Sequence, residues 1–158
     1  MKLDKILIRE PDSIEFKKIA KFSFENFVVE MAKSSGKSAD ELKSYLGSTP
    51  DQIYENEIWR VIELSDKQIG FLWVKLNPKD MTAFGYDIYL EPEFRSKGIG
   101  RSVMNQLGQE IKNLGYTTVN ICVFEENIIA RALYESLGFQ VVKFDESRKQ
   151  YHLNCKID

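Results

Sequence analysis

The sequence has little histidine and cysteine, with one His and two Cys among 158 residues. Cys122 and Cys155 form no CxxC pair and have no spacing typical of metal ligands, which favours reduced structural thiols and argues against a structural metal site. His152 lies in the last expected strand, where we expect no catalytic role. We therefore expect no metal cofactor.

The sequence also lacks a long apolar run, a basic excess and a Gly/Ser/Pro-rich linker. No segment reaches the length of a membrane span, and residues 1–11 carry charge where a signal peptide has an apolar core. Its 22 basic and 24 acidic side chains give a net charge of −2, whereas a general nucleic-acid binder is typically basic. These absences predict one cytoplasmic domain over residues 1–158 that binds neither membrane nor nucleic acid.

The pattern of apolar residues and helix-starting signals predicts a mixed α/β fold. Asp12 with Glu15, and Ser38 with Glu41, fit capping boxes that begin two helices. Pro50 suits the first position of a short helical turn over residues 49–52. One sheet with helices packed on it accounts for the order of elements. Strands are expected over residues 3–9, 57–64, 68–76, 82–90, 117–124, 139–144 and 150–156, and further helices over 98–114 and 127–137.

The most informative segment covers residues 86–101, where a strand leads through a short loop into a helix that starts at paired glycines. A helix N-terminus offers unpaired backbone N–H groups and the positive end of a dipole. Gly98 and Gly100 leave room for phosphate oxygens near the backbone. Arg95, Lys97 and Arg101 add positive charge, so the segment suits a pyrophosphate.

Other glycine-rich phosphate motifs fit this segment poorly. A dinucleotide-binding GxGxxG motif needs a third glycine where Val103 stands, and an acidic residue near Asn120. A P-loop needs GxxxxGK followed by Ser or Thr, which residues 98–102 do not supply. The motif alone leaves two interpretations open, a pyrophosphate site and a solvated glycine-rich turn before a helix.

A resemblance to a known family favours the first interpretation. Arg95-x-x-Gly98-x-Gly100 resembles the coenzyme A motif R/Q-x-x-G-x-G/A of the GNAT family of N-acetyltransferases. Residues 123–139 resemble the second family motif, a strand, Asn-x-x-A-x-x-x-Tyr on a helix, and Gly-Phe. The resemblance is strong over residues 82–144 and slight over the first fifty. It implies a single-domain GNAT-like fold, with a central, mostly antiparallel sheet and helices on both faces, and acetyl-CoA as co-substrate.

The resemblance also implies roles for individual residues. The loop amides would hold the pyrophosphate, the preceding strand would pair with the pantetheine arm, Asn127 would contact the cofactor, and Tyr134 would act as general acid. Asn127 and Tyr134 are seven residues apart, about two helical turns, so they share a helix face with Ala130 and Arg131 between them. The alternative for Tyr134 is a half-buried core tyrosine. The expected cofactor-binding residues are Ile88, Tyr89, Leu90, Arg95, Ser96, Lys97, Gly98, Ile99, Gly100, Arg101, Asn127, Ala130, Arg131 and Tyr134.

Asp87 is the predicted general base, because this part of the central strand often faces the acceptor site in the family. Alternation along the strand predicts that Asp87 and Tyr89 face one side of the sheet while Tyr86 and Ile88 face the other. The alternative for Asp87 is a structural or substrate-orienting carboxylate. Residues Glu125 and Glu126, at a strand end near the cofactor, are lesser candidates.

The function implied is transfer of an acetyl group from acetyl-CoA to a primary amine of a small molecule or peptide, by direct attack in a ternary complex. The acceptor pocket is expected between the first two helices and residues 77–81, where acidic Glu25 and Glu30 favour a cationic amine. Two alternatives stay open: transfer of a different acyl group, and a cofactor-binding or interaction module with weak catalysis. Members of the family are often dimers, which implies a homodimer, although no residue here decides it.

Overall fold

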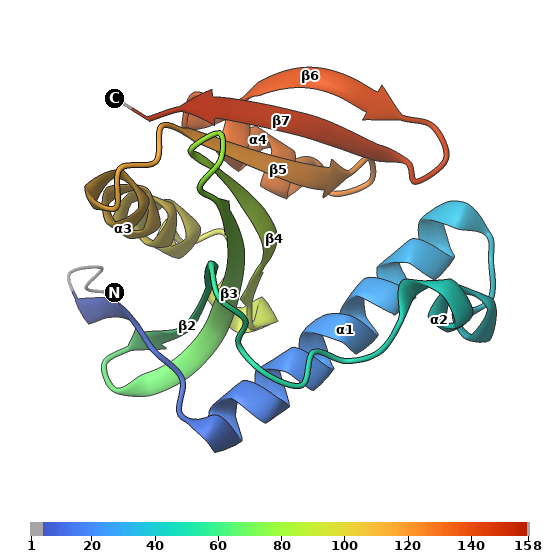
Figure 1. Cartoon of the computed structure of the whole chain (residues 1–158), viewed down its shortest axis with the longest axis horizontal. Helices are drawn as coiled ribbons and strands as arrows, with labels where there is room; N and C mark the ends of the chain where they lie inside the picture. The colour runs from blue at the N-terminus through green and yellow to red at the C-terminus, as the bar shows by residue number, and fades with distance from the viewer. Residues whose placement is uncertain (1–4, 158) are drawn as a thin grey trace.

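The computed structural model describes residues 5–157, and its centre is one seven-stranded sheet in the order β1-β2-β3-β4-β5-β7-β6 (Figure 1). β4 and β5 are parallel, and the other neighbouring pairs are antiparallel. This confirms the expected mixed, mostly antiparallel sheet. The strands are β1 (Ile6–Arg9), β2 (Glu57–Leu64), β3 (Lys67–Asn77), β4 (Thr82–Leu90), β5 (Thr118–Phe124), β6 (Gln140–Asp145) and β7 (Gln150–Lys156).

Both N-terminal helices begin where their capping signals predict. The carboxylate of Asp12 and that of Glu15 form a reciprocal capping box at the start of α1 (Ser13–Ser35), which ends at Gly36 in the left-handed conformation. The Ser38 hydroxyl accepts a hydrogen bond from the Glu41 N–H and begins α2 (Ala39–Leu46). Local side-chain chemistry therefore sets both starting points.

The prediction of a helical turn over residues 49–52 is wrong, because these residues are irregular. Pro50 is compatible with a helix start, but residues 51–56 are all exposed. A short helix is marginal unless it buries an apolar face, and this segment has none to bury. Residues 47–56 instead form an extended return from α2 to β2 (Figure 1).

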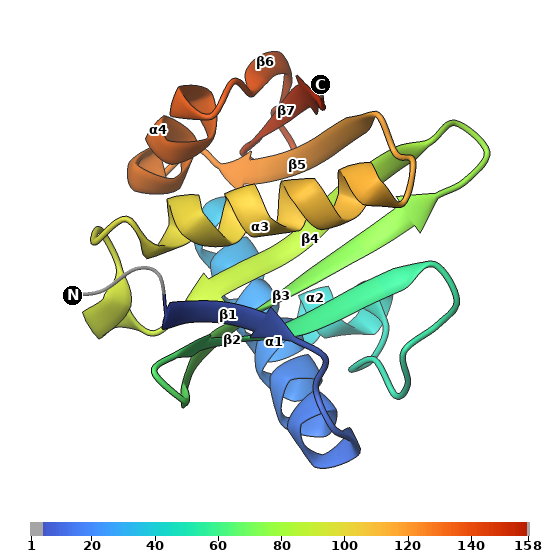
Figure 2. The ribbon, with the colours of Figure 1, turned by 90° about the vertical axis from the view of Figure 1, so that its left-hand side faces the viewer.

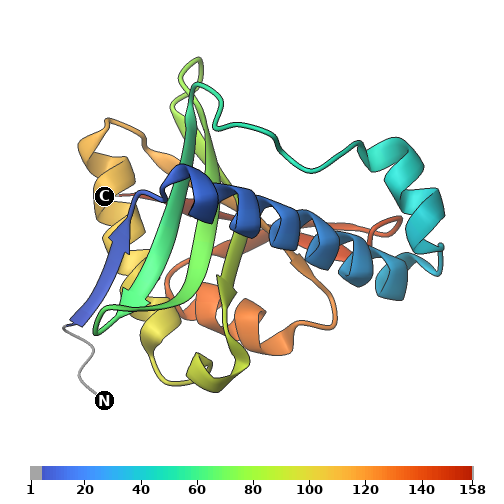
Figure 3. The same ribbon diagram turned by 90° about the horizontal axis from the view of Figure 1, so that it is seen from below.

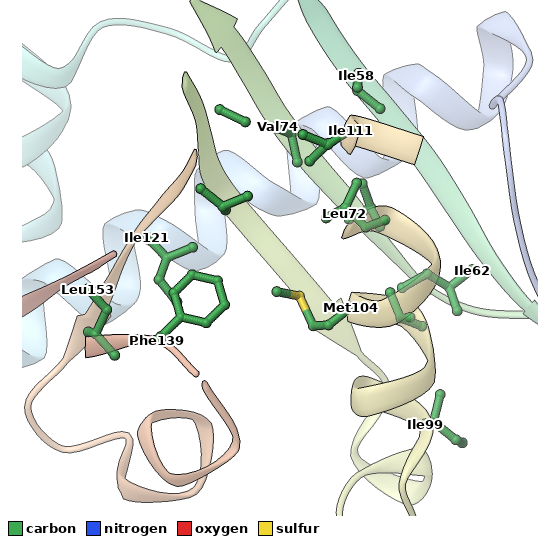
Figure 4. Packing of buried hydrophobic residues seen from close by; sticks show 14 of the residues in the cluster. Ile58, Ile62, Leu72, Val74, Ile99, Met104, Ile111, Ile121, Phe139 and Leu153 are labelled. Carbon is green, nitrogen blue, oxygen red and sulfur yellow. The ribbon is translucent and has the colours of Figure 1, made fainter. Parts of the chain in front are cut away.

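Helices cover both faces of the sheet. Phe16, Ile19 and Ala20 of α1 pack against aromatic residues of β2, β3 and β4, and Figure 3 shows α1 (blue) lying across these strands. The other face carries α3 (Ile99–Asn113) and α4 (Ile128–Ser136). Figure 4 shows the larger core, where Ile99, Met104 and Ile111 of α3 meet sheet residues. The labelled sheet residues of this core include Ile58, Ile62, Leu72, Val74, Ile121 and Leu153.

An ion-pair cluster ties the first turn of α1 to the edge of the sheet. Arg9 on β1 donates to Glu15 of α1 at 2.7 Å and to Glu63 of β2 at 2.6 Å. The bond to the guanidinium of Arg9 is the main cause that lowers the pKa of Glu15 to about 2. The capping box and this cluster share Glu15, so the start of α1 is held from two sides.

Gly70 allows β3 and β4 to lie close together at the end of β4. Gly70 is opposite Leu90, and a Cβ atom at position 70 would lie 2.0 Å from the Tyr89 carbonyl oxygen. That oxygen belongs to the backbone, so a side-chain rotation cannot relieve the clash. The β4 residues expected to bind pantetheine thus depend on a glycine in the neighbouring strand.

We expect Gly70→Ala to lower the free energy of unfolding by about 1–3 kcal/mol, because the extra methyl group overpacks the strand pair. Gly108→Ala is a matched control, since Gly108 lies within α3 and a Cβ atom there meets nothing within 4 Å. Because alanine favours helix more than glycine, this control should stabilise by up to about 1 kcal/mol. Urea unfolding of both variants measures the difference, and equal stabilities would contradict the close approach.

Candidate active site

The candidate site lies where β4 and β5 separate. Their parallel pairing runs over four residue pairs, from Thr82 with Thr118 to Gly85 with Ile121. Beyond that point β4 continues to pair with β3 and β5 continues to pair with β7. Figure 2 shows the two strands diverging toward the N-terminal end of α3. The separation leaves one backbone edge of residues 86–90 facing a gap in the sheet.

Two helices begin at the mouth of this gap, because each parallel strand leads directly into one. β4 runs through the short 3₁₀ helix η2 (Pro92–Phe94) into α3, and β5 leads into α4. The carboxyl ends of parallel strands lie at the same edge of a sheet, so both helix N-termini lie there. The positive ends of two helix dipoles therefore flank the gap.

The N-terminus of α3 differs from those of the other helices. Side chains of Asp12, Ser38 and Asn127 cap α1, α2 and α4, whereas the N-cap of α3 is Gly98, which offers none. Gly98 has a φ of +83°, in the left-handed region that favours glycine. The first N–H groups of α3 thus remain available to an anion, as the coenzyme A motif requires.

Basic side chains surround this helix end, although two of them also contact the protein. The Arg95 guanidinium donates to the Leu90 carbonyl at 2.8 Å and lies 5.2 Å from the Tyr89 ring centre. Arg101 donates to the Ser136 hydroxyl at 2.6 Å, which links α3 to α4. Ser96 and Lys97 are exposed in the loop between them. The loop therefore carries positive charge, and the arginine side chains at its two ends are held by hydrogen bonds.

Gly100 has a packing role that the motif did not indicate. A Cβ atom at this position would lie 3.1 Å from Cδ2 of Leu133 on α4. A small residue here lets α3 and α4 approach at the gap, in addition to any role in phosphate approach. Ile99, next to it, is fully buried in the core and anchors the first turn of α3.

A β-bulge changes the expected directions of side chains on β4. Trp73 is opposite Asp87 but Val74 is opposite Gly85, so Tyr86 is an extra residue. Its ring stacks on Trp73 with centres 4.6 Å apart, on the face covered by α1. The prediction that Tyr86 faces the Ile88 side was wrong, because the bulge interrupts simple alternation. Asp87 and Tyr89 do share the α1 face, as expected.

Asp87 is partly buried and bound by α1. The Ser23 hydroxyl donates to its Oδ2 at 2.6 Å, and the Ile88 backbone N–H also bonds to the carboxylate. Burial raises the pKa of Asp87 from 3.8 to about 6, and these two hydrogen bonds oppose that rise. At neutral pH the carboxylate is mostly ionised, yet its pKa is close enough to 7 for proton exchange.

Tyr134 lies on the opposite face of the sheet from Asp87. Its ring packs against the α3 side of the core, with its centre 5.7 Å from that of Phe139. Burial, and to a smaller extent the negative charge of Asp87, raises the pKa of Tyr134 to about 12. The two groups lie on different faces of the sheet, and the negative charge of Asp87 still acts on Tyr134.

Asn127 lies at the N-cap of α4 and not within the helix as predicted. Its side-chain oxygen accepts from the Ala130 N–H at 3.1 Å, which leaves its amide N–H groups as donors. Ala130 faces the core beside Tyr134. Arg131 lies over the Tyr151 ring at 4.0 Å and pairs with Glu135, so it faces β7.

The remaining candidates lie elsewhere. Glu125 and Glu126 are exposed in the turn after β5. His152 lies beside Cys122 on neighbouring strands, with Nδ1 3.4 Å from the thiol sulfur. Residues 5–157 contain no group of three or more His, Cys, Asp or Glu side chains placed to hold a metal ion. None of the helices in this range is long and apolar enough to cross a membrane.

Comparison with known proteins gives the family. The model of the Acetyltransferase (GNAT) family matches residues 24–139, which is more than half of the chain and includes both motifs. The chain belongs to the GNAT family. This confirms the resemblance on which the interpretation of Arg95, Gly98 and Asn127 was based.

Relatives and solved structures agree with the GNAT assignment. The uncharacterized N-acetyltransferase YycN of Bacillus subtilis (strain 168) is 33% identical over 97 residues, 60% of this chain and 62% of the relative. The [Ribosomal protein bS18]-alanine N-acetyltransferase of Salmonella typhimurium is 39% identical over 74 residues, 47% of this chain and 49% of the relative. The match thus spans less than two thirds of these relatives' lengths. The fold is similar to spermidine N-acetyltransferase from Vibrio cholerae with CoA and spermine, at a TM-score of 0.70, 21% identity, and coverage of 98% and 96%.

Sequence reasoning missed Ser23. It sits within the apolar stripe of α1 and is 3% exposed, one of two buried polar residues in the described part of the chain. The signal that could have found it was a small polar residue at helical spacing among Phe16, Ile19 and Ala20. Such a residue needs a polar partner, but a helix pattern does not say which one.

We expect Asp87→Asn to stabilise the GNAT fold at high pH. Because the folded-state pKa is raised, the contribution of Asp87 to stability is complete below pH 3.8 and is lost as pH rises through about 6. At pH 8 the buried charge then lowers the free energy of unfolding by about 3 kcal/mol, which corresponds to the rise of the Asp87 pKa from 3.8 to about 6. Asn is neutral at both pH values. The stability of the variant relative to wild type should therefore rise by about this amount from pH 4 to pH 8 in urea unfolding. A difference that does not change with pH would contradict the raised pKa.

Proposed function

We propose that this chain transfers an acetyl group from acetyl-CoA to a primary amine of a small molecule or peptide, by direct attack in a ternary complex. The observation that carries the proposal is the gap between β4 and β5, with the uncapped N-terminus of α3 at its mouth and with Asp87 and Tyr134 at its two faces. Relatives named N-acetyltransferases support it.

The loop and the first turn of α3 would hold the pyrophosphate through backbone N–H groups, with Arg95, Lys97 and Arg101 supplying charge. The pantetheine arm would lie in the gap and pair with β4. The Glu91 N–H bonds to Ile69 of β3, and N–H directions alternate along a strand. The backbone N–H groups of Ile88 and Leu90 therefore point into the gap, and the N–H of Tyr89 points toward β3.

Asp87 would act as general base. An amine must lose a proton before or during attack on the thioester carbonyl, and an ionised carboxylate on the α1 face can accept it directly or through water. The aromatic rings of Phe22 and Tyr86 are 40% and 47% exposed on this side of the sheet. Aromatic faces beside a carboxylate favour a cationic amine.

Attack produces negative charge on the carbonyl oxygen, which a fixed backbone donor can stabilise. We assign this donor to the Ile88 N–H, because it points into the gap just after the bulge. Its hydrogen bond to the Asp87 side chain would have to be shared or exchanged during the reaction. Proximity of amine and thioester would supply much of the rate, up to about 7–11 kcal/mol in ideal cases.

Tyr134 would donate to the leaving sulfur. With a pKa of about 12 its hydroxyl keeps its proton throughout the physiological range. An ordinary thiol has a pKa of about 8.5, so complete transfer of the phenol proton to the thiolate is uphill. The hydroxyl would therefore donate a hydrogen bond to the sulfur as the C–S bond breaks and would keep its own proton. The departing thiolate would take its proton from solvent.

The side chains on the α1 face of the sheet would determine which class of amine accepts the acetyl group. Relatives with similar folds act on different amines, since one is named for spermidine and another for a ribosomal alanine. Acetyl-CoA titrated into the chain in a calorimeter, followed by a screen of amines with detection of released thiol, tests the proposal. Micromolar binding with amine-dependent thiol release supports it. Binding without release for any amine indicates a cofactor-binding module, and faster release from succinyl-CoA indicates another acyl group.

We expect Gly98→Asp to abolish detectable binding of acetyl-CoA, because a side chain and a negative charge would occupy the approach to the α3 backbone. Gly36→Asp is the matched control. Gly36 also has a positive φ, of 75°, and ends α1 away from the gap, so the substitution brings the same backbone strain and charge. Calorimetry should show wild-type affinity for the control. Equal losses in both variants would mean that general destabilisation, and not the phosphate loop, explains the effect.

We expect Tyr134→Phe to reduce kcat by about 10²–10⁴-fold, the usual contribution of a proton donor, with little change in acetyl-CoA affinity. Phenylalanine keeps the ring that packs against Phe139, so the fold should be retained. Steady-state kinetics together with calorimetry separate the two effects. A wild-type kcat would show that Tyr134 is a core residue without a role in proton donation.

A further inference from the structure

One hydrogen bond connects the candidate base to the helix that covers its face. Ser23 and Asp87 are 64 residues apart in sequence, and the Ser23 hydroxyl donates to Oδ2 of Asp87 at 2.6 Å. This length is typical of a hydroxyl that donates to an ionised carboxylate. The bond occupies one carboxylate oxygen from the α1 side and so restricts rotation of the group.

The direction of this bond is unusual for a serine within a helix. Ser34 and Ser35, later in α1, donate to backbone carbonyl groups one turn earlier. Ser23 instead donates across to another element from a position that is 3% exposed. An apolar side chain at this position would bury more apolar surface but would leave a buried carboxylate with one fewer donor.

Charged groups around Asp87 do not replace this donor. Lys21 and Glu25, which flank Ser23 on α1, are exposed, and β3 places the uncharged Trp73 opposite Asp87. On α4, Tyr134 has a pKa of about 12, so its phenol is neutral at physiological pH. The bonds that favour ionisation of Asp87 come from the Ser23 hydroxyl and the Ile88 backbone.

We propose that Ser23 is a positioning residue that orients the Asp87 carboxylate and keeps it ionised for proton transfer. The proposal rests on the function of Asp87 as the base in acetyl transfer. Ser23 itself touches neither substrate nor reacting atoms. Its hydroxyl holds Oδ2 on the α1 side, and the bond offsets part of the effect of burial on the acid–base equilibrium of Asp87.

Ser23→Ala tests the proposal through the pH dependence of kcat/KM. Removing the donor should move the acidic limb of the profile upward by about one pH unit, because the ionised form loses a charge-assisted bond. Activity should fall most below pH 7 and recover in part at pH 9. Ser23→Thr keeps the hydroxyl and should restore the limb to its wild-type position.

Ser35→Ala is the matched control on the same helix. Its hydroxyl donates to the Met31 carbonyl at 2.6 Å, so the substitution also removes one serine bond from α1 but leaves Asp87 alone. The pH profile of this variant should match wild type. A similar shift in both variants would assign the effect to a general loss of α1 stability and would overturn the positioning role.

A second readout does not depend on turnover. The carbon-13 resonance of the Asp87 carboxyl group, followed by NMR over pH, gives its pKa directly in wild type and in Ser23→Ala. An upward shift of about one unit supports the proposal, and an unchanged value overturns it. Asp87→Asn separates this result from the proposed function. If Asp87→Asn leaves the acidic limb and kcat/KM unchanged, Asp87 is not the base, whereas loss of the limb in Asp87→Asn without a shift in Ser23→Ala overturns only the role of Ser23.

Discussion

The end of the parallel pairing between β4 and β5 determines the rest of the site. Four pairs hold the strands together, and Gly85 closes the last one, where a Cβ atom would lie 2.9 Å from Cγ2 of Ile121. The bulge at Tyr86 follows immediately and turns β4 toward β3. Because parallel strands lead into helices at the same edge, this separation also places the starts of α3 and α4 on either side of the gap. An unpaired edge of β4 and two positive helix ends thus come from a single change in pairing.

The electrostatics of the site come mainly from burial. Removal from water is the largest cause of the raised pKa values of both Asp87 and Tyr134. Burial brings the pKa of the Asp87 carboxylate closer to neutral pH. The same effect keeps the Tyr134 hydroxyl protonated at neutral pH. The same burial would make an unpartnered carboxylate costly, and Ser23 and the Ile88 backbone reduce that cost. The burial that would suit Asp87 to act as the proposed base therefore also lowers stability when the carboxylate is ionised.

Local signals in the sequence predicted most of the elements. Capping residues such as Asp12 and Ser38 act on backbone groups three residues away, so they mark helix starts without knowledge of the fold. The first motif placed the loop at Gly98 because that loop is also a local structure, whereas Asn127 was expected within a helix and is its N-cap. The resemblance covered the C-terminal half of the chain more strongly than the N-terminal helices.

The features that could not be predicted depend on contacts between distant segments. The bulge at Tyr86 exists only in the register between β3 and β4, and a single strand read alone shows simple alternation. The packing role of Gly100 was missed because Leu133, which a Cβ atom at position 100 would meet, lies on another helix. The bond from Ser23 joins α1 to β4, and a polar residue on the apolar face of a helix does not by itself say which partner it has. Pro50 gave a valid local signal that failed because residues 51–56 bury no apolar face.

The four-pair junction between β4 and β5 also has a consequence for folding. Strands β1 to β4 pair with neighbours in an antiparallel arrangement, and β5 to β7 form a second antiparallel group. Within residues 5–157, the two groups of strands hydrogen-bond to each other only through the parallel pair of β4 and β5, whose connection contains α3. Contacts that close long loops form late, so each half can gain structure before the halves join. The gap exists only after this junction forms, so a chain whose two groups of strands have not yet joined would lack the proposed site.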